Sequence, residues 1–292
     1  MKYEKAFLQT ELVPDGCKYA TLAPENNPGG LPLLFLFHGG QGDRRFLSTM
    51  QPLIEQAVAE GWIDPIVVAT PSARMSYYMD YQDGSEKWES MICTELLQKI
   101  KNDHQVDTSR LLVSGISMGG VGCLRLAFRN PERFIAVASL EAGVDPFLSL
   151  ADKPAWYALN EDTRLGSKFG TPIDEAFWRA NNPANIVQDS PGVLKNLKIY
   201  LEVGTHDGLF NHHNVEFLHR VLFDQHIKHE YRTYLGANHI GNSIPGRFSD
   251  ALKFLGAALR PTPVDEAADK LTQTVLQNYQ AQSIAPPEPH SH

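Results

Sequence analysis

The chain lacks several features that mark particular classes of protein. Its 292 residues carry a net charge of −8, so there is no excess of positive charge. A chain this acidic is expected neither to bind nucleic acid nor to dock on an anionic membrane surface, because it would repel their phosphates. No apolar run approaches the roughly 18 residues that cross a bilayer. Internal repeats and a glycine-rich phosphate-binding loop are also missing.

Cysteine is scarce as well. Cys17, Cys93 and Cys123 are odd in number and follow no ligand spacing, so we expect buried thiols rather than a disulfide framework. The first residues contain neither an apolar core nor a small-residue cleavage site, so no signal peptide is predicted. A cytoplasmic location is therefore expected, although a mature chain that has lost its signal would have the same features.

What the chain does contain is a regular alternation of apolar runs and segments with helical spacing. Continuous apolar runs are typical of strands buried on both faces, and their alternation with helices predicts a mostly parallel sheet covered on both sides. The predicted strands of this sheet are residues 31–37, 63–70, 111–113, 134–140, 197–203 and 228–235. Residues 4–22 instead alternate polar and apolar around a Pro-Asp-Gly turn, which predicts an antiparallel hairpin.

Two segments depart from this rhythm. Residues 143–196 hold several prolines, glycines and aromatic residues and are too long for a simple connection, so we expect a helical insertion or lid. This insertion belongs to one predicted domain, residues 1–260. Residues 261–292 are expected to form a C-terminal helix at 265–280 and a disordered tail, where His290 and His292 are read as solvated rather than metal-binding.

The most informative stretch is the Gly-x-Ser-x-Gly pattern that begins at Gly115. An apolar strand precedes it and a helix follows, which is the context of a serine nucleophile elbow. Gly115 and Gly119 permit a close backbone approach that a Cβ would prevent, and the turn exposes the hydroxyl of Ser117 above the sheet. The amide of Met118 then points to where an oxyanion would form, at a helix N-terminus. The alternative is an ordinary glycine-rich turn.

A second glycine-rich turn, His38-Gly39-Gly40-Gln41-Gly42, follows the predicted strand 31–37. Backbone amides in such a loop can supply the second donor of an oxyanion hole. We expect that donor to be the amide of Gly40, with Gln41 as the near rival. A plain glycine turn is the alternative.

A serine hydroxyl needs a base, and the base needs an acid to orient it. Asp207 and His239 each follow a late predicted strand, at the same sheet edge as Ser117. The order serine, acid, histidine along the chain fits this architecture. Glu141 and Asp145, which follow the strand after the elbow, are rivals for the acid.

Other histidines compete for the role of base. They precede the predicted acid or fall in or beside the next helix, whereas His239 alone follows a last strand. These rivals are His206, His212, His213, His219, His226 and His229. A metal cluster of His206, Asp207, His212 and His213 is conceivable, but it has no compact motif and lies at a helix N-terminus, which disfavours cations. We therefore predict neither a metal nor another cofactor.

Aromatic residues gather between residues 72 and 88 and again in the insertion. Tyr77, Tyr78 and Trp88 could line a substrate pocket or pin a long loop to the body. With His38 and Trp178 they make up the predicted substrate-binding set. They favour a small ester with an aryl or otherwise apolar part.

Together these motifs resemble the serine esterase family of α/β-hydrolases, which includes feruloyl esterases, S-formylglutathione hydrolase, enterochelin-esterase-type enzymes and the antigen 85 acyltransferases. The matching segments lie within residues 31–259 and are residues 38–40, 88–97, 115–120, 129–134, 178–183, 204–207 and 236–239. The resemblance implies an α/β-hydrolase fold with its nucleophile at Ser117, acid at Asp207 and base at His239. It also implies oxyanion amides near Gly40 and on Met118.

The predicted activity is hydrolysis of a small-molecule carboxylic ester through an acyl-enzyme. Acyl transfer to an alcohol would use the same residues and remains an alternative. A non-catalytic binding protein of the same fold is a second alternative. The sequence leaves the oligomeric state open, including a homo-oligomer.

Overall fold

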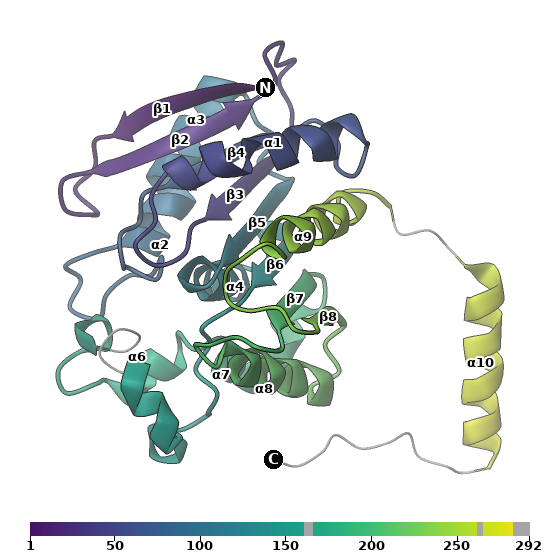
Figure 1. The fold of residues 1–292 in the computed structure, drawn as a ribbon. Helices are drawn as coiled ribbons and strands as arrows, with labels where there is room; N and C mark the ends of the chain where they lie inside the picture. Colours follow the sequence, from purple (N-terminus) through teal and green to yellow (C-terminus); the bar gives the residue numbers. More distant parts are fainter. Residues whose placement is uncertain (161–165, 262–264, 283–292) are drawn as a thin grey trace.

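The computed structural model describes residues 1–160, 166–261 and 265–282, and an eight-stranded sheet forms its centre (Figure 1). The strands are β1 (Lys2–Leu8), β2 (Cys17–Ala23), β3 (Leu33–Phe37), β4 (Val67–Pro71), β5 (Leu111–Ile116), β6 (Phe134–Leu140), β7 (Lys198–Gly204) and β8 (His229–Tyr234). Their spatial order is β1-β2-β4-β3-β5-β6-β7-β8. Strands β1 and β2 form an antiparallel hairpin, and β2 also pairs antiparallel with β4. From β4 through β3 and β5 to β8, all neighbouring strands are parallel. The predicted hairpin and mostly parallel sheet are confirmed.

Side chains of each strand alternate between two cores, one on each face of the sheet. In β3, Leu33, Phe35 and Phe37 enter one core, whereas Leu34 and Leu36 enter the other. Both faces are covered, which explains why the central strands read as continuous apolar runs.

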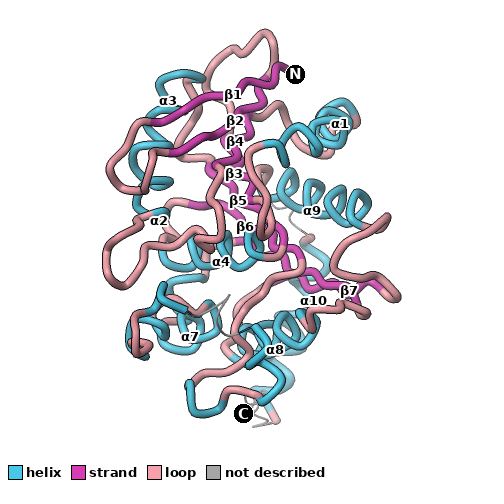
Figure 2. The backbone as a smooth tube through the Cα atoms, turned by 60° about the vertical axis from the view of Figure 1, so that its left-hand side comes forward, coloured by secondary structure: helices cyan, strands magenta, loops and turns pink. Residues whose placement is uncertain are grey.

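Helices cover both faces of the sheet, as Figure 2 shows. On one side lie α1 (Arg45–Ala59) and α9 (Ile244–Ala258). On the other lie α4 (Met118–Arg129), α8 (Asn211–Asp224), and α2 (Trp88–Met91), which continues through a π-helical turn (Ile92–Leu96) into α3 (Leu97–His104). Helix α9 begins at Ile244, where Pro245 suits the first turn of a helix.

In the described residues of the insertion, 143–160 and 166–196, the regular structure is a series of short helical pieces, including α6 (Glu175–Arg179) and α7 (Pro183–Asp189). Its aromatic rings pack on one another: Trp178 stacks on Phe147 with centroids 5.3 Å apart, and Tyr157 meets Phe147 edge-on. These rings belong to the core on one face of the sheet, so the insertion is packed into the body of the domain.

The helix predicted at 265–280 is α10 (Glu266–Ala281), which Figure 1 shows standing apart from the sheet. The predicted disordered tail, with His290 and His292, lies outside the described residues. The helices that the structure describes include none long and apolar enough to cross a membrane. Cys17 and Cys123 are buried, Cys93 is partly buried, and all three are free thiols.

Candidate active site

The turn between β5 and α4 has the geometry of a strained elbow. Ser117 has φ 59° and ψ −117°, an unusual conformation for a residue with a side chain. A Cβ on Gly119 would lie 2.5 Å from the carbonyl oxygen of Phe37, and a Cβ on Gly115 would meet the backbone of Gly119. The close approach predicted from the two glycines is thus present.

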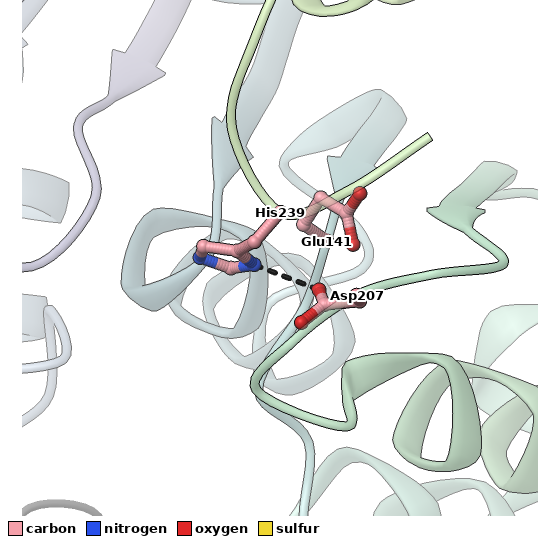
Figure 3. Close-up of side chains that lie close together, drawn as sticks. All are labelled: Glu141, Asp207 and His239. Atoms are coloured by element: carbon pink, nitrogen blue, oxygen red, sulfur yellow. Dashed lines mark hydrogen bonds and ion pairs between the residues drawn. The ribbon is translucent and has the colours of Figure 1, made fainter. Parts of the chain in front are cut away.

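The structure brings Ser117, His239 and Asp207 into a chain of hydrogen bonds. Nε2 of His239 lies 2.9 Å from Oγ of Ser117. Nδ1 of His239 lies 2.7 Å from Oδ2 of Asp207, the contact drawn as a dashed line in Figure 3. Because a carboxylate only accepts, Nδ1 carries the proton, which leaves Nε2 free to accept from the serine hydroxyl. The Leu209 amide donates to Oδ1 of Asp207 at 2.6 Å and fixes the carboxylate further.

Two backbone segments border Ser117 where an oxyanion would sit. Met118 is the first residue of α4, so its amide is at the positive end of the helix. Across the site, the Gly40 amide makes no hydrogen bond to any described residue, whereas the Gln41 amide donates to Sδ of Met75 at 3.3 Å. The geometry leaves Gly40 as the more available of the two predicted donors.

His38 is buried and holds the loop of residues 38–42 in place through hydrogen bonds. It does not line the cavity beside Ser117, contrary to our prediction. Its Nε2 accepts from the Ala73 amide at 3.0 Å, so Nδ1 carries the proton and donates to the Gly39 carbonyl at 2.7 Å. Burial lowers the pKa of His38, which keeps the ring neutral. The histidine therefore shapes the loop rather than contacting a substrate.

Of the predicted substrate-binding aromatic residues, only Tyr77 reaches the cavity. Tyr78 stacks on Phe37 with ring centroids 3.9 Å apart and donates its hydroxyl to the His38 carbonyl. Trp88 and Trp178 are fully buried. The prediction that these three line a pocket is wrong, because their rings fill the core and hold loops in place.

A cavity of about 280 Å³ adjoins the hydroxyl of Ser117. Its wall combines polar groups with apolar side chains, among them an exposed leucine, Leu209. The lining residues are Gly40, Gln41, Met75, Tyr77, Ser117, Met118, Gly143, Leu209, Asn211 and His239. Trp156 of the insertion packs on Phe210, the neighbour of Leu209, so the insertion reaches the rim.

Behind Asp207 lies a buried cluster of charged groups. Arg247 of α9 donates to Glu202 of β7 through Nε at 2.5 Å and Nη2 at 2.8 Å, and Nη2 also donates to Glu141. Burial is the main cause that raises the pKa of Glu202, to about 7, against the effect of Arg247. Glu141, a rival for the acid, lies beside Asp207, but the carboxylate that pairs with His239 is that of Asp207.

Three of the other rivals, Asp145, His219 and His229, have partners away from Ser117. Asp145 accepts from the Trp178 indole at 2.7 Å and from the Tyr157 hydroxyl, so it anchors the insertion. His219 and His229 pair with one another at 2.8 Å. Among the described residues, the acidic and histidine side chains that come closest to a metal-type grouping are Glu141, Asp207 and His239, with ligand atoms within 4.8 Å of one another. The set around His212, which the sequence analysis considered and set aside, is not such a grouping.

Several residues of the site were missed by the sequence analysis. Met75, Leu209, Asn211 and Gly143 line the cavity without belonging to any short motif. Glu202 did carry a signal, because it is a charged residue inside the apolar run of β7. A charge at such a position predicts a buried partner, here Arg247.

The comparison with protein families decides the relationship. The model of the Esterase family matches residues 15–243. The chain belongs to this family. Among curated relatives, an esterase of Mycobacterium tuberculosis is 26% identical over 256 residues, which cover 82% of this chain and 55% of the relative. A diacylglycerol acyltransferase/mycolyltransferase of Mycobacterium leprae is 27% identical over 192 residues, covering 62% of this chain and 57% of that protein. This esterase-family chain thus matches about half the length of these relatives.

Solved structures show the fold. A ferulic acid esterase superposes with a TM-score of 0.71 at 20% identity, covering 89% of this chain and 98% of that one. An S-formylglutathione hydrolase from Agrobacterium tumefaciens gives 0.72 at 20% identity, covering 88% and 95%. The α/β-hydrolase fold predicted for this member of the Esterase family is confirmed.

Proposed function

We propose that this chain is a serine carboxylic ester hydrolase. The observation that carries the proposal is the unbroken hydrogen-bonded path from Asp207 through His239 to Ser117, beside a cavity. Such an arrangement activates a hydroxyl that is otherwise a poor nucleophile. Membership of the Esterase family supports the same reaction class.

In the proposed mechanism, Oγ of Ser117 attacks the ester carbonyl carbon while Nε2 of His239 takes its proton. His239 then gives this proton to the leaving alcohol, and Asp207 stabilises the imidazolium formed in between. Amides of Met118 and Gly40 hold the oxyanion; the loss of one such donor typically costs about 10²–10³ in rate. Water, activated by His239, releases the acid from the acyl-enzyme.

The cavity favours a small ester. At about 280 Å³ it is at the lower end of ligand pockets, and Met75, Tyr77 and Leu209 give its wall an apolar part. We therefore propose that the acyl or alcohol group held there is short or a single aryl ring. Rates for p-nitrophenyl esters from acetate to dodecanoate, and for aryl esters such as methyl ferulate, test this. A preference for the longest chains would contradict it.

Hydrolysis itself is tested on the same panel with wild type and Ser117→Ala. We expect turnover by the wild type and its loss in the variant. A folded wild type that is inactive on the whole panel would favour the non-catalytic binding protein.

Acyl transfer is the second candidate, supported by the relatives named diacylglycerol acyltransferase/mycolyltransferase. Product analysis with added glycerol separates the two, since transfer yields a glycerol ester where hydrolysis yields free acid.

A further inference from the structure

The buried charges behind Asp207 do not balance if every carboxyl group is ionised. Arg247 faces Glu141 and Glu202, and Glu141 adjoins Asp207, whose other neighbour is His239. Three carboxylates and one guanidinium would leave two uncompensated negative charges while the imidazole is neutral. All four of these charged groups are almost fully buried, where unpaired charge is strongly unfavourable. One carboxyl group is therefore expected to hold a proton.

The hydrogen bonds indicate which carboxyl it is. Both oxygens of Glu202 accept from Arg247, and both oxygens of Asp207 accept, from His239 and from the Leu209 amide. These two groups are used entirely as acceptors, which favours their ionised forms. Glu141 is different: Oε1 accepts from Arg247 and from the Gly204 amide, whereas Oε2 is buried and receives a hydrogen bond from no described residue.

The unpaired oxygen of Glu141 has an acceptor next to it. Figure 3 shows the carboxyl groups of Glu141 and Asp207 facing one another beside the ring of His239. Two carboxylates in this arrangement would repel, but a protonated Oε2 can donate to Asp207. Burial and then Asp207 raise the pKa of Glu141 to about 9, despite Arg247. Burial opposes ionisation of Asp207, yet the hydrogen bonds with His239 and Glu141 outweigh it and lower that pKa to about 2.

The backbone holds Glu141 in this place. Its φ of +49° lies in the left-handed region, which is uncommon for a residue with a side chain. Its amide donates to the Glu202 carbonyl at 3.0 Å, and its own carbonyl accepts from Asn211 at 3.0 Å. Asn211 also lines the cavity, so this bond ties the backbone of Glu141 to the site.

We propose that Glu141 is a positioning residue that stays neutral at pH 7 and donates a hydrogen bond from Oε2 to Asp207. This bond holds the Asp207 carboxylate where it accepts from Nδ1 of His239, and Arg247 fixes the opposite oxygen of Glu141. The inference rests on the proposed roles of Ser117, Asp207 and His239. It assigns Glu141 no contact with the substrate.

The protonation of Glu141 can be measured without any reaction. In protein labelled with ¹³C at the glutamate carboxyl carbons, the resonance that disappears in Glu141→Gln belongs to Glu141. We expect this resonance to keep the shift of a protonated acid from pH 5 to pH 8. Titration below pH 6 would overturn the proposal. A stoichiometric metal ion retained after dialysis against a chelator would also overturn it, because a cation would then occupy the place of the proton.

The positioning role is tested by two substitutions of similar length. Glu141→Gln can donate from its amide and still accept from Arg247 and Gly204, whereas Glu141→Met can do neither. With a fluorophosphonate probe, we expect labelling of Ser117 within about threefold of wild type for Gln and at least about tenfold slower for Met. Equal slowing in both variants would overturn the proposal. A wild type that is not labelled at all would instead contradict the proposed function, and the carboxyl titration would still decide the state of Glu141.

Discussion

Trp178 donates its indole N–H to Oδ2 of Asp145 at 2.7 Å, and both side chains are buried. The bond ties α6 to the segment that leaves β6. Trp178 lies in one of the segments on which the resemblance to the esterases was based, and this bond gives it a structural role.

Trp178→Phe should therefore destabilise the fold without changing substrate binding. The ring still packs on Phe147, but Asp145 loses a donor, which costs about 1–3 kcal/mol. Urea unfolding measures the loss, and KM for a reactive ester should stay within about twofold of wild type. A large rise in KM with unchanged stability would mean that Trp178 contacts the substrate after all.

Leu209 should contribute to substrate binding. Its side chain lines the cavity and is 45% exposed, so an acyl or aryl group can cover it. Leu209→Ser should raise KM for apolar esters by about tenfold, with a smaller effect on kcat. Phe223→Ser is the matched control, because Phe223 is 54% exposed on α8 and outside the cavity lining. Equal effects of the two substitutions would contradict the proposed site.

Gly119→Ala should displace the elbow. The added Cβ would lie 2.5 Å from the Phe37 carbonyl oxygen and 2.6 Å from that of His38, so β3 or α4 must move. Loss of about 1–3 kcal/mol in stability and of most esterase activity is expected. Gly192→Ala, where the Cβ meets nothing within 4 Å, should change neither. Full activity in Gly119→Ala would show that the close approach is not needed.

The pH dependence of stability should report Glu141. Burial and Asp207 raise the pKa of Glu141 to about 9. The contribution of its proton to the stability of the fold is therefore fully present below the ordinary pKa of 4.5, and it is lost as pH rises toward 9. The side chain of Glu141→Gln does not titrate. Between pH 5 and 9, the free energy of unfolding of the wild type should therefore fall relative to that of this variant. The slope of the fall with pH should not exceed the slope expected for one bound proton. Parallel stability curves from urea unfolding would rule this out.

The sequence was a good guide wherever a residue pattern reflects a local physical demand. Continuous apolar runs predicted the parallel strands because both sheet faces are covered. The glycines around Ser117 predicted the elbow because no side chain fits there. Asp207 and His239 could be placed near Ser117 because parallel strands end at one edge of the sheet.

Contacts between segments that are distant in the sequence could not be predicted from these patterns. An aromatic residue on a loop can face a cavity or the core, and Tyr78 and Trp88 face the core because Phe37 and neighbouring helices provide surface for them. Arg247 pairs with Glu141 and Glu202 only because α9 crosses β6 and β7, which spacing along the chain does not reveal. The charged Glu202 inside an apolar strand was the available signal of this cluster.

The most direct test of the proposed activity is the intact mass of the protein after reaction with a fluorophosphonate probe, measured on wild type and Ser117→Ala. We predict one adduct on the wild type and none on the variant, since only a serine activated by His239 reacts quickly. A folded wild type without an adduct, or an adduct that persists in Ser117→Ala, would contradict the assignment of Ser117 as the nucleophile.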